Sequence, residues 1–314
     1  MGKIQFDKAY YIKLGERGVW EEDSINNGKI RIGWGDTQLE DIQKGNWNKI
    51  KKEIQEDFRA RNKKKGATQD FNALKNIYDA DSNTVFVTFH NSKLWWCRVR
   101  DEVGKDRIKE DGTSKYREVD GKWSDQDMDR KALLSHQISG KLSILQMFRG
   151  TSCKVGAIDH LRRLINAEHS PEYNSISEAK KELKSRGVAG IKLLHWKDFE
   201  ILVDLVFSQA GWRRVSVLGE TMKFFDLVLE EPITNDRYGV QIKSAATSGD
   251  FKNYAERFTN SEFKRLYFVV HSTDDEKLSE DSKDYENVEL IFADELAKMV
   301  VDGGLVDWLM GKIQ

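Results

Sequence analysis

The stretch that decides the fold is Phe224–Lys243, which reads FFDLVLEEPITNDRYGVQIK. Two segments rich in apolar residues, Phe224–Leu229 and Tyr238–Lys243, flank a segment around Pro232 that also contains Asn and Asp. Pro, Asn and Asp are the residues that favour turns. The sequence therefore predicts two strands that follow one another and are joined by a turn.

Polar residues interrupt both predicted strands. Asp226 lies inside the first strand, and Gln241 and Lys243 lie two residues apart on the second. Side chains two apart on a strand share one face of the sheet. A charged group in an apolar strand needs a partner or a function. If the strands are adjacent, the turn brings Asp226 close to Gln241 and Lys243.

Phosphodiester hydrolysis needs such a cluster. A carboxylate holds a divalent cation against the phosphate, and a lysine ammonium offsets the negative charge that develops. Glu200, from the preceding helix, completes the set, and hard oxygen ligands suit Mg²⁺, with Mn²⁺ as a substitute. The simpler alternative is an ion pair between Asp226 and Lys243. The order helix Glu, strand Asp, turn, Gln-x-Lys favours the catalytic interpretation.

The surrounding segments predict a small α/β unit. WKDFEILVDLVFSQ, at Trp196–Gln209, places apolar residues at helical spacing. A strand is expected at Trp212–Leu218, and two more at Phe263–His271 and Asn287–Phe292, followed by a helix over Ala293–Val301. Asp204 lies one helical turn after Glu200, so either acid could face the site.

Asp198–Ala246 resembles the PD-(D/E)xK nuclease superfamily in its Mrr-like restriction endonuclease branch. The similar segments are DFEILVDLVFSQAGWRRV, FFDLVL and GVQIKSA. The resemblance implies a restriction-endonuclease-like α/β domain with a central mixed sheet. It further implies Asp226 as metal ligand, Lys243 as catalytic lysine and Glu200 as the helix acid. Gln241 would replace a second acid, and the main-chain carbonyl of Ile242 would be another ligand. Phe225 departs from the proline that precedes the aspartate in that family.

The first half of the chain predicts mixed α and β structure. Short strands are expected at Ala9–Leu14 and Lys29–Trp34, and a charged helix at Asn46–Asn62. Thr84–His90 and Lys93–Arg100 read as strands joined by a tight Asn91-Ser92 turn. The segments AYYIKL, IGWGD and TVFVTFHNSKLWWCRV resemble the PUA-like superfamily, including EVE and YTH-type modules. That resemblance implies a β-barrel-type domain that holds a modified base in an aromatic cage.

Six tryptophans fall in this half, and aromatic side chains are the usual walls of a pocket for an unstacked base. For any one of them, core packing is the commoner role. Under the PUA-like resemblance the cage candidates are Trp20, Trp34 and Trp95, with Asp36 to read a base edge. Candidate contacts to the DNA backbone are Lys63, Lys64, Lys65, Arg98, Arg100 and Arg149.

Composition excludes several classes of protein. The two cysteines are too few for a disulfide framework, and no apolar run approaches the roughly 20 residues that span a bilayer. The N-terminus has no apolar signal segment, so a cytoplasmic protein is expected. A formal net charge of −1 counts mildly against a nucleic-acid binder, although local patches, not net charge, determine such binding.

These observations predict three parts: residues 1–165 as a PUA-like domain that recognises a modified base, 166–190 as a helical linker with a helix over Ser175–Arg186 ended by Gly187, and 191–314 as the nuclease domain. The expected function is a modification-dependent restriction endonuclease in phage defence, cutting double-stranded DNA with Mg²⁺. Cutting both strands takes two active sites, so a homodimer is expected. Alternatives are a sequence-specific or ligand-regulated defence nuclease, or a DNA-binding protein with an inactive nuclease fold.

Overall fold

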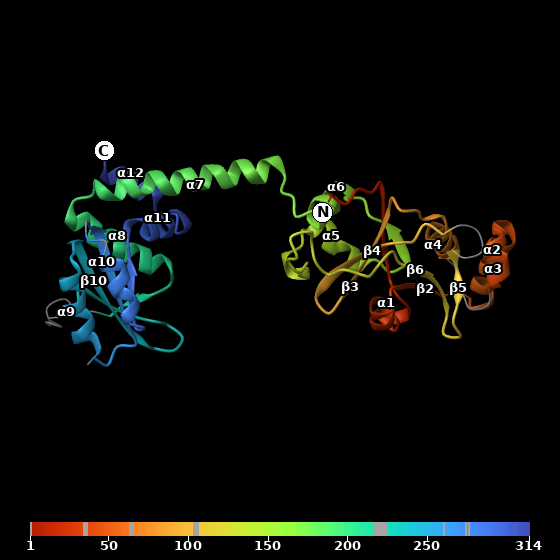
Figure 1. Ribbon diagram of the computed structural model, residues 1–314, viewed down its shortest axis with the longest axis horizontal. Helices are drawn as coiled ribbons and strands as arrows, with labels where there is room; N and C mark the ends of the chain where they lie inside the picture. The colour runs from red at the N-terminus through yellow and green to blue at the C-terminus, as the bar shows by residue number, and fades with distance from the viewer. Residues whose placement is uncertain are drawn as a thin grey trace. The chain divides into compact units, whose positions relative to one another are not determined.

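The computed structural model divides the chain into two compact units, Met1–Ser170 and Pro171–Gln314 (Figure 1). The structure describes residues 2–33, 37–62, 66–102, 107–215, 225–259, 261–273, 275 and 277–314. The boundary falls immediately before the long helix α7, Pro171–Lys192, so this helix belongs to the second unit. The predicted linker at 166–190 is thus mostly part of the second unit.

The first unit contains two sheets. One has the strand order β4-β3-β1-β7, and the other has the order β2-β6-β5. Their bounds are β1 Lys8–Ile12, β2 Lys29–Ile32, β3 Thr84–His90, β4 Lys93–Arg98, β5 Lys109–Glu110, β6 Lys115–Glu118 and β7 Ser152–Lys154. The β3–β4 hairpin turns through Asn91 and Ser92, whose φ angles of 48° and 60° confirm the predicted tight turn.

The predicted barrel is not found: the described strands of the first unit form two open sheets and no closed barrel. Strand β1 pairs in parallel with β3 and antiparallel with β7, which leaves β4 and β7 as the edges of their sheet. The second sheet is short, because β5 pairs with β6 over only two residues on each strand. An isolated bridge between Val99 and Val119 lies where the chain passes from one sheet toward the other.

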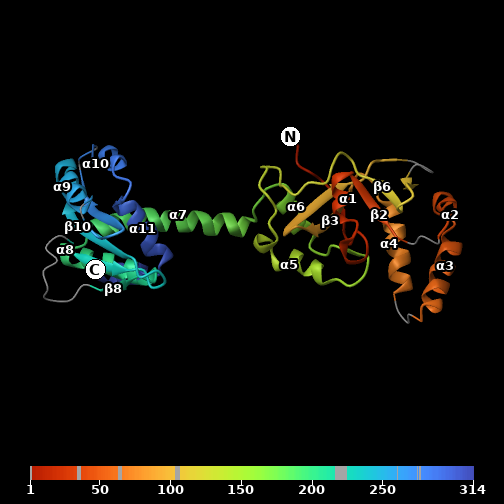
Figure 2. The same cartoon turned by 90° about the horizontal axis from the view of Figure 1, so that it is seen from below.

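Helices cover both faces of the larger sheet. A hydrophobic core lies on each face, and side chains along a strand point to the two cores in turn. Phe86 packs in one core, and Val85 and Val87 pack in the other. Helices α2, α3 and α4 group at one end of the unit (Figure 2). The helices are α1 Glu21–Asn26, α2 Leu39–Lys44, α3 Trp47–Ala60, α4 Ala67–Asp79, α5 Gly140–Ser143 and α6 Ile158–Ile165, with short 3-10 turns η1 Glu16–Gly18, η3 Ser135–Gln137 and η4 Ile144–Met147.

The second unit is a mixed five-stranded sheet of order β12-β11-β10-β9-β8. β10 runs antiparallel to β9 and parallel to β11, which in turn is parallel to β12. The bounds are β8 Arg213–Arg214, β9 Leu227–Glu230, β10 Arg237–Ala245, β11 Arg265–Ser272 and β12 Val288–Ile291. The strands occur along the chain in the predicted sequence, and β9 and β10 are neighbours as expected. Strand β9 begins at Leu227, one residue after Asp226. The strand predicted over Trp212–Leu218 is found as β8, Arg213–Arg214, and residues 216–218 of the prediction lie outside the described residues.

Two helical layers enclose this sheet. Helix α8 packs with α7 and α11 in the core that contains Val240 and Ile242, and α9 packs on the opposite face against Phe268 and Val270 (Figure 2). The helices are α7 Pro171–Lys192, α8 Trp196–Gln209, α9 Ser248–Thr259, α10 Lys277–Asp281, α11 Ala293–Asp302 and α12 Val306–Lys312, with the 3-10 turn η5 Ser282–Asp284. No helix in the described part of the chain is long and apolar enough to cross a membrane.

The prediction that Gly187 ends its helix is wrong, because α7 continues for five further residues. A methyl group on Gly190 would lie 3.3 Å from atoms of Leu309 and Ile313, and one on Gly187 would lie 3.5 Å from Ala297. The two glycines thus let α7 approach its neighbours closely. Close packing outweighs the low helix propensity of glycine here.

Candidate active site in the second unit

The β9–β10 hairpin places Asp226 opposite Gln241. Val240 pairs with Leu227, and the backbone N–H of Asp226 donates to the carbonyl of Val240 at 2.9 Å. The carboxylate oxygen Oδ2 of Asp226 accepts two hydrogen bonds, from the backbone N–H of Ile242 at 2.6 Å and from Nε2 of Gln241 at 2.5 Å. Strand register therefore fixes the orientation of this carboxylate.

Ionisation of the Asp226 carboxyl group is less favourable than that of an aspartate in water. Its pKa is raised above the usual value because partial burial removes water from the carboxylate. The hydrogen bonds from Ile242 and Gln241 and the positive charge of Lys243 act in the opposite direction without outweighing this effect. The other oxygen, Oδ1, accepts no hydrogen bond from the described residues, so it is available to a further ligand.

Gln241 is buried, with 5% of its surface exposed, and its amide points its nitrogen at Asp226. An ionised carboxylate only accepts hydrogen bonds, so the amide must present its NH₂ group there. This contact holds the Asp226 carboxylate in place. The amide oxygen, which the sequence analysis assigned as a metal ligand, is the atom turned away from Oδ2.

Lys243 follows Gln241 on the same face of β10, where its side chain is half-buried. Its ammonium lies 4.8 Å from the centre of the Tyr254 ring on α9, a cation–π distance. Among the described residues Lys243 forms no ion pair. Its charge therefore acts on Asp226 and on the space beside it without being neutralised locally.

Glu200 lies on the exposed side of α8. Its pKa is raised, first by partial burial and then by the negative charge of Asp226, while Lys197 opposes the shift. The acid one turn later behaves differently: Asp204 forms an ion pair with Arg214 at 3.1 Å. Of the two acids that the sequence analysis considered, Glu200 is the one coupled to Asp226.

The residues present fit a divalent cation. Two carboxylates, of Asp226 and Glu200, repel one another, and a cation between like charges would relieve that repulsion. Oδ1 of Asp226 is free of hydrogen bonds from the described residues. Among those residues no three His, Cys, Asp or Glu side chains gather at one point. Two carboxylates with a neutral oxygen such as the Ile242 carbonyl suit Mg²⁺, because this cation keeps several of its water ligands in proteins.

Two contacts around the site were not predicted. A methyl group on Gly239 would come within 2.9 Å of the Phe225 ring, so the glycine makes room for that ring. Phe225 also packs edge-to-face on Phe263, with centroids 5.1 Å apart. The side chain before Asp226 is thus held in place by packing. Tyr254, the cation–π partner of Lys243, lies on α9, which begins three residues after β10 ends, and the sequence analysis did not single it out.

The residues predicted to bind a base are not all brought together. Trp34 and Asp36 lie outside the described residues. Trp20 is half-buried and lines a cavity in the first unit, described below. Trp95 packs against a hydrophobic core, and its indole N–H donates to the carbonyl of His90 at 3.2 Å. Trp95 is not among the residues that line this cavity, which makes it a packing residue here.

The predicted DNA-backbone contacts also divide into groups. Lys63, Lys64 and Lys65 lie outside the described residues. Arg98 pairs with Asp120 at 3.4 Å, and Arg100 pairs with Glu118 at 2.7 Å. Arg149 is exposed at the cavity and has no ion-pair partner among the described residues. Of the described candidates, Arg149 is the one whose charge is not already paired.

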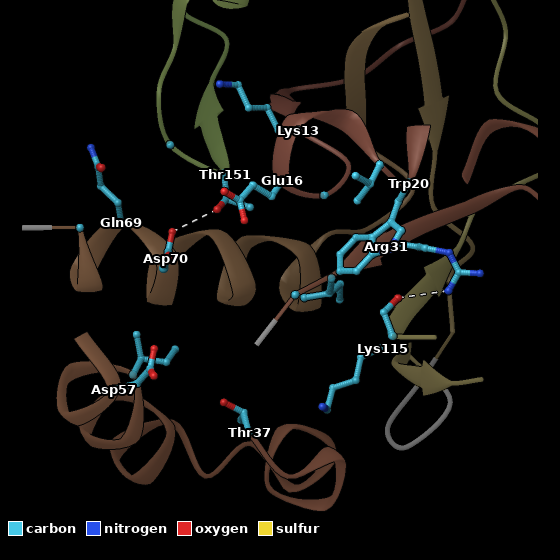
Figure 3. A pocket seen from close by; sticks show the side chains of 18 of the residues that line it. Lys13, Glu16, Trp20, Arg31, Thr37, Asp57, Gln69, Asp70, Lys115 and Thr151 are labelled. Atoms are coloured by element: carbon cyan, nitrogen blue, oxygen red, sulfur yellow. Dashed lines mark hydrogen bonds between the residues drawn. The ribbon is translucent and has the colours of Figure 1, made fainter. Parts of the chain in front are cut away.

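The cavity has a volume of about 1280 Å³ and lies within the first unit (Figure 3). Its walls come from segments distant in sequence, including the turn before α1, strand β2, helices α3 and α4, and the β6 strand. Figure 3 shows Trp20 and Lys115 directed into it, opposite Thr37 and Asp57. Lys115 is buried, with 3% of its side chain exposed, and lies 3.5 Å from Glu110.

Comparison with known proteins gives a family match that falls in the second unit. The structure search matches the chain to a protein titled DNA modification-dependent restriction endonuclease AspBHI, at 12% sequence identity and a TM-score of 0.33, over 77% of this chain and 74% of that one. The search of curated proteins found no match. Residues 191–300 match the family model Mrr_cat, described as a restriction endonuclease. The second unit thus contains a restriction endonuclease domain of the Mrr_cat family, and all four candidate catalytic residues lie within it.

Proposed function

We propose that the chain is a modification-dependent restriction endonuclease whose second unit hydrolyses DNA with Mg²⁺. The observation that carries the proposal is the Asp226 carboxylate, held by Gln241 and the Ile242 N–H, with the unpaired ammonium of Lys243 on the same strand. The match of residues 191–300 to a restriction endonuclease family supports it.

The residues would divide the work as follows. Asp226 and Glu200 supply the carboxylate oxygens that bind the cation, and Gln241 keeps Asp226 turned toward it. A divalent cation held there would supply Lewis-acid chemistry, polarising the phosphate and lowering the pKa of a water molecule. Lys243 offsets the negative charge that develops on the phosphate during attack. Ile242 stays a proposed ligand through its main-chain carbonyl.

The first unit would select the DNA. Trp20 and Arg149, both from the predicted recognition residues, line one cavity and supply an aromatic wall and an unpaired cation. An aromatic wall with a nearby cation is the combination that holds a base and its phosphate. We propose a modified base in double-stranded DNA as the feature recognised, and a homodimer as the form that cuts both strands.

Digestion of phage and plasmid DNAs of known modification tests the proposal. The protein should cut a subset of modified DNAs in the presence of Mg²⁺ and leave matched unmodified DNA intact. Equal cutting of both would favour a sequence-specific nuclease. Binding without cutting, in Mg²⁺ and in Mn²⁺, would favour a DNA-binding protein with an inactive nuclease fold.

A further inference from the structure

Helix α8 begins with a large apolar side chain that faces solvent. Trp196, its first residue, is 49% exposed, although Leu194 and Phe199 on either side are buried in the core of the second unit. Leu193, in the turn between α7 and α8, is exposed as well. Single exposed apolar residues are common, whereas groups of them are typical of contact surfaces. These two side chains therefore indicate a surface that meets another molecule.

A cation lies over the indole of Trp196. The ammonium of Lys197 is 5.2 Å from the centre of that ring, within the range of a cation–π contact. Lys197 is exposed and forms no ion pair with the described residues. The indole thus favours one position of the ammonium and leaves its charge available to an anion.

Both residues lie beside the candidate active site. Side chains three and four residues apart on a helix are neighbours, so Trp196 and Lys197 adjoin Glu200 on the exposed face of α8. Burial raises the pKa of Glu200, Asp226 raises it further, and the Lys197 ammonium lowers it, so the three charges are close enough to interact. An anion bound to Lys197 would therefore lie next to the cation site proposed at Asp226 and Glu200.

A DNA strand offers an anion and an apolar surface together. Each phosphate lies between two deoxyribose rings, whose C–H groups can pack on an indole. Lysine binds phosphate as a point charge, and contacts to phosphate and sugar fix the register of the DNA without reading its sequence. A free anion would use the Lys197 ammonium alone, whereas a strand would also cover Trp196. The pair of side chains thus favours a backbone segment over a small anion.

We propose that Lys197 binds the phosphate next to the scissile one and that Trp196 packs on the deoxyribose between them, so that the two residues position the strand for cleavage. The proposal rests on the proposed function for DNA as the substrate and deepens it. Neither residue touches the reacting atoms, and both are positioning residues that the sequence analysis did not single out.

A footprint of the lysines tests the contact without cutting. The full chain with Asp226→Ala is acetylated with and without a 40-bp duplex, either unmodified or with every cytosine 5-methylated, and acetylation is measured by mass spectrometry. At least one duplex should protect Lys197. Lys298, an exposed lysine on α11, is the matched control and should react equally with and without DNA.

Single-turnover cleavage of a susceptible DNA tests the role. Lys197→Gln should raise the half-saturating protein concentration about 5-fold, the scale of one exposed charge pair, and lower its slope against the logarithm of salt concentration by about one. Lys197→Arg should restore both values, which a merely structural role would not require. Lys298→Gln should match the parent.

Trp196→Ala should raise the half-saturating concentration without changing the salt slope, and Trp196→Phe should recover part of the loss. Thermal unfolding checks that Trp196→Ala folds. If it does not fold, the Lys197 variants decide, because that side chain is exposed.

Equal acetylation of Lys197 with and without either duplex overturns the proposal, as does an unchanged salt slope in Lys197→Gln. Protection that depends on protein concentration instead of DNA also overturns it, because a second copy of the chain would then cover this surface. A chain that cuts modified DNA with Lys197 unprotected retains the proposed function and loses this contact. A chain whose Lys197 is protected by DNA but that cuts none, in Mg²⁺ or Mn²⁺, retains the contact and loses the proposed function.

Discussion

Two charged sites, the Arg31 cluster of the first unit and the Asp226 site of the second, differ in how their buried charge is compensated. In the first unit Arg31 is 3% exposed at its side chain and is satisfied by Asp111 and Asp23. The Arg31 guanidinium holds the pKa of Asp111 well below its usual range, and Asp111 in turn raises the pKa of Arg31. In the second unit burial raises the pKa values of Asp226 and Glu200, and among the described residues no arginine forms an ion pair with either.

The difference separates structural charge from functional charge. A carboxylate whose pKa is lowered by a fixed partner stabilises the fold. A carboxylate whose pKa is raised by burial lowers stability when it ionises, and such groups are common at functional sites. On this criterion the Arg31 cluster is structural, and the Asp226 site is the one that we propose binds a cation.

The largest effect should come from Asp226→Ala. Without this carboxylate the cation loses its best-oriented ligand, so cleavage of a susceptible DNA should be abolished while DNA binding persists. Asp236→Ala is the matched control, since Asp236 lies in the same hairpin and pairs with Lys264 at the surface. If Asp226→Ala cuts DNA with Mg²⁺ at the parent rate, Asp226 is not part of the active site. The contrast drawn between the Arg31 cluster and the Asp226 site would then be wrong.

Lys243→Ala should follow, with a loss on the order of 10²-fold or more in cleavage rate, because the transition-state charge is no longer offset. Single-turnover cleavage at saturating DNA measures it. Lys264→Ala removes an exposed lysine of the same unit and should leave the rate near that of the parent. A loss confined to DNA affinity would make Lys243 a binding residue instead.

A smaller effect distinguishes the two acids of α8. Glu200→Ala should slow cutting by about 10-fold and raise the Mg²⁺ concentration at half-maximal rate, because a carboxylate leaves the cation site. Asp204→Ala should change the Mg²⁺ requirement little, since Asp204 is occupied by Arg214. The reverse ranking would show that Asp204, and not Glu200, faces the cation.

The smallest effects concern stability and have opposite signs in the two units. Asp111 has a lowered pKa, so its stabilisation is present above the ordinary carboxyl pKa and is lost as pH falls. Asp226 has a raised pKa, so its ionisation destabilises the fold as pH rises through that pKa. At neutral pH without divalent cation, Asp111→Asn should lower the unfolding temperature by about 5 °C and Asp226→Asn should raise it by about 2 °C. Calorimetry measures both shifts, and shifts of the same sign would contradict the comparison.

The sequence predicted the parts of this chain that depend on local pattern. Spacing two apart put Gln241 and Lys243 on one face, and the Pro232 turn brought Asp226 opposite them, as the β9–β10 register confirms. Helix α8 has the predicted bounds. Packing decided the end of α7, where Gly187 and Gly190 fit against neighbours that no local pattern reveals.

The first unit was predicted less well, because its structure depends even more on packing between segments that are distant in sequence. Its strands are short, and the walls of its cavity come from segments far apart in sequence, so no local pattern predicted the cavity. Tryptophan richness identified Trp20 but equally suggested Trp95, whose indole packs in the core. Whether a tryptophan lines the cavity or packs in the core depends on its burial, and burial is determined by the assembled fold.

One face of β10 carries two of the four candidate catalytic residues and holds a third, Asp226. Gly239 admits the Phe225 ring, Gln241 holds Asp226, and Lys243 carries the free ammonium, while Val240 and Ile242 point into the core on the other side. Loss or gain of one codon within this strand would exchange the two faces. Such a change would move Lys243 into the core beside α8 and take Val240 and Ile242 out of that core at once. Natural variants of this gene should therefore tolerate point substitutions in β10 far more often than single-residue insertions or deletions.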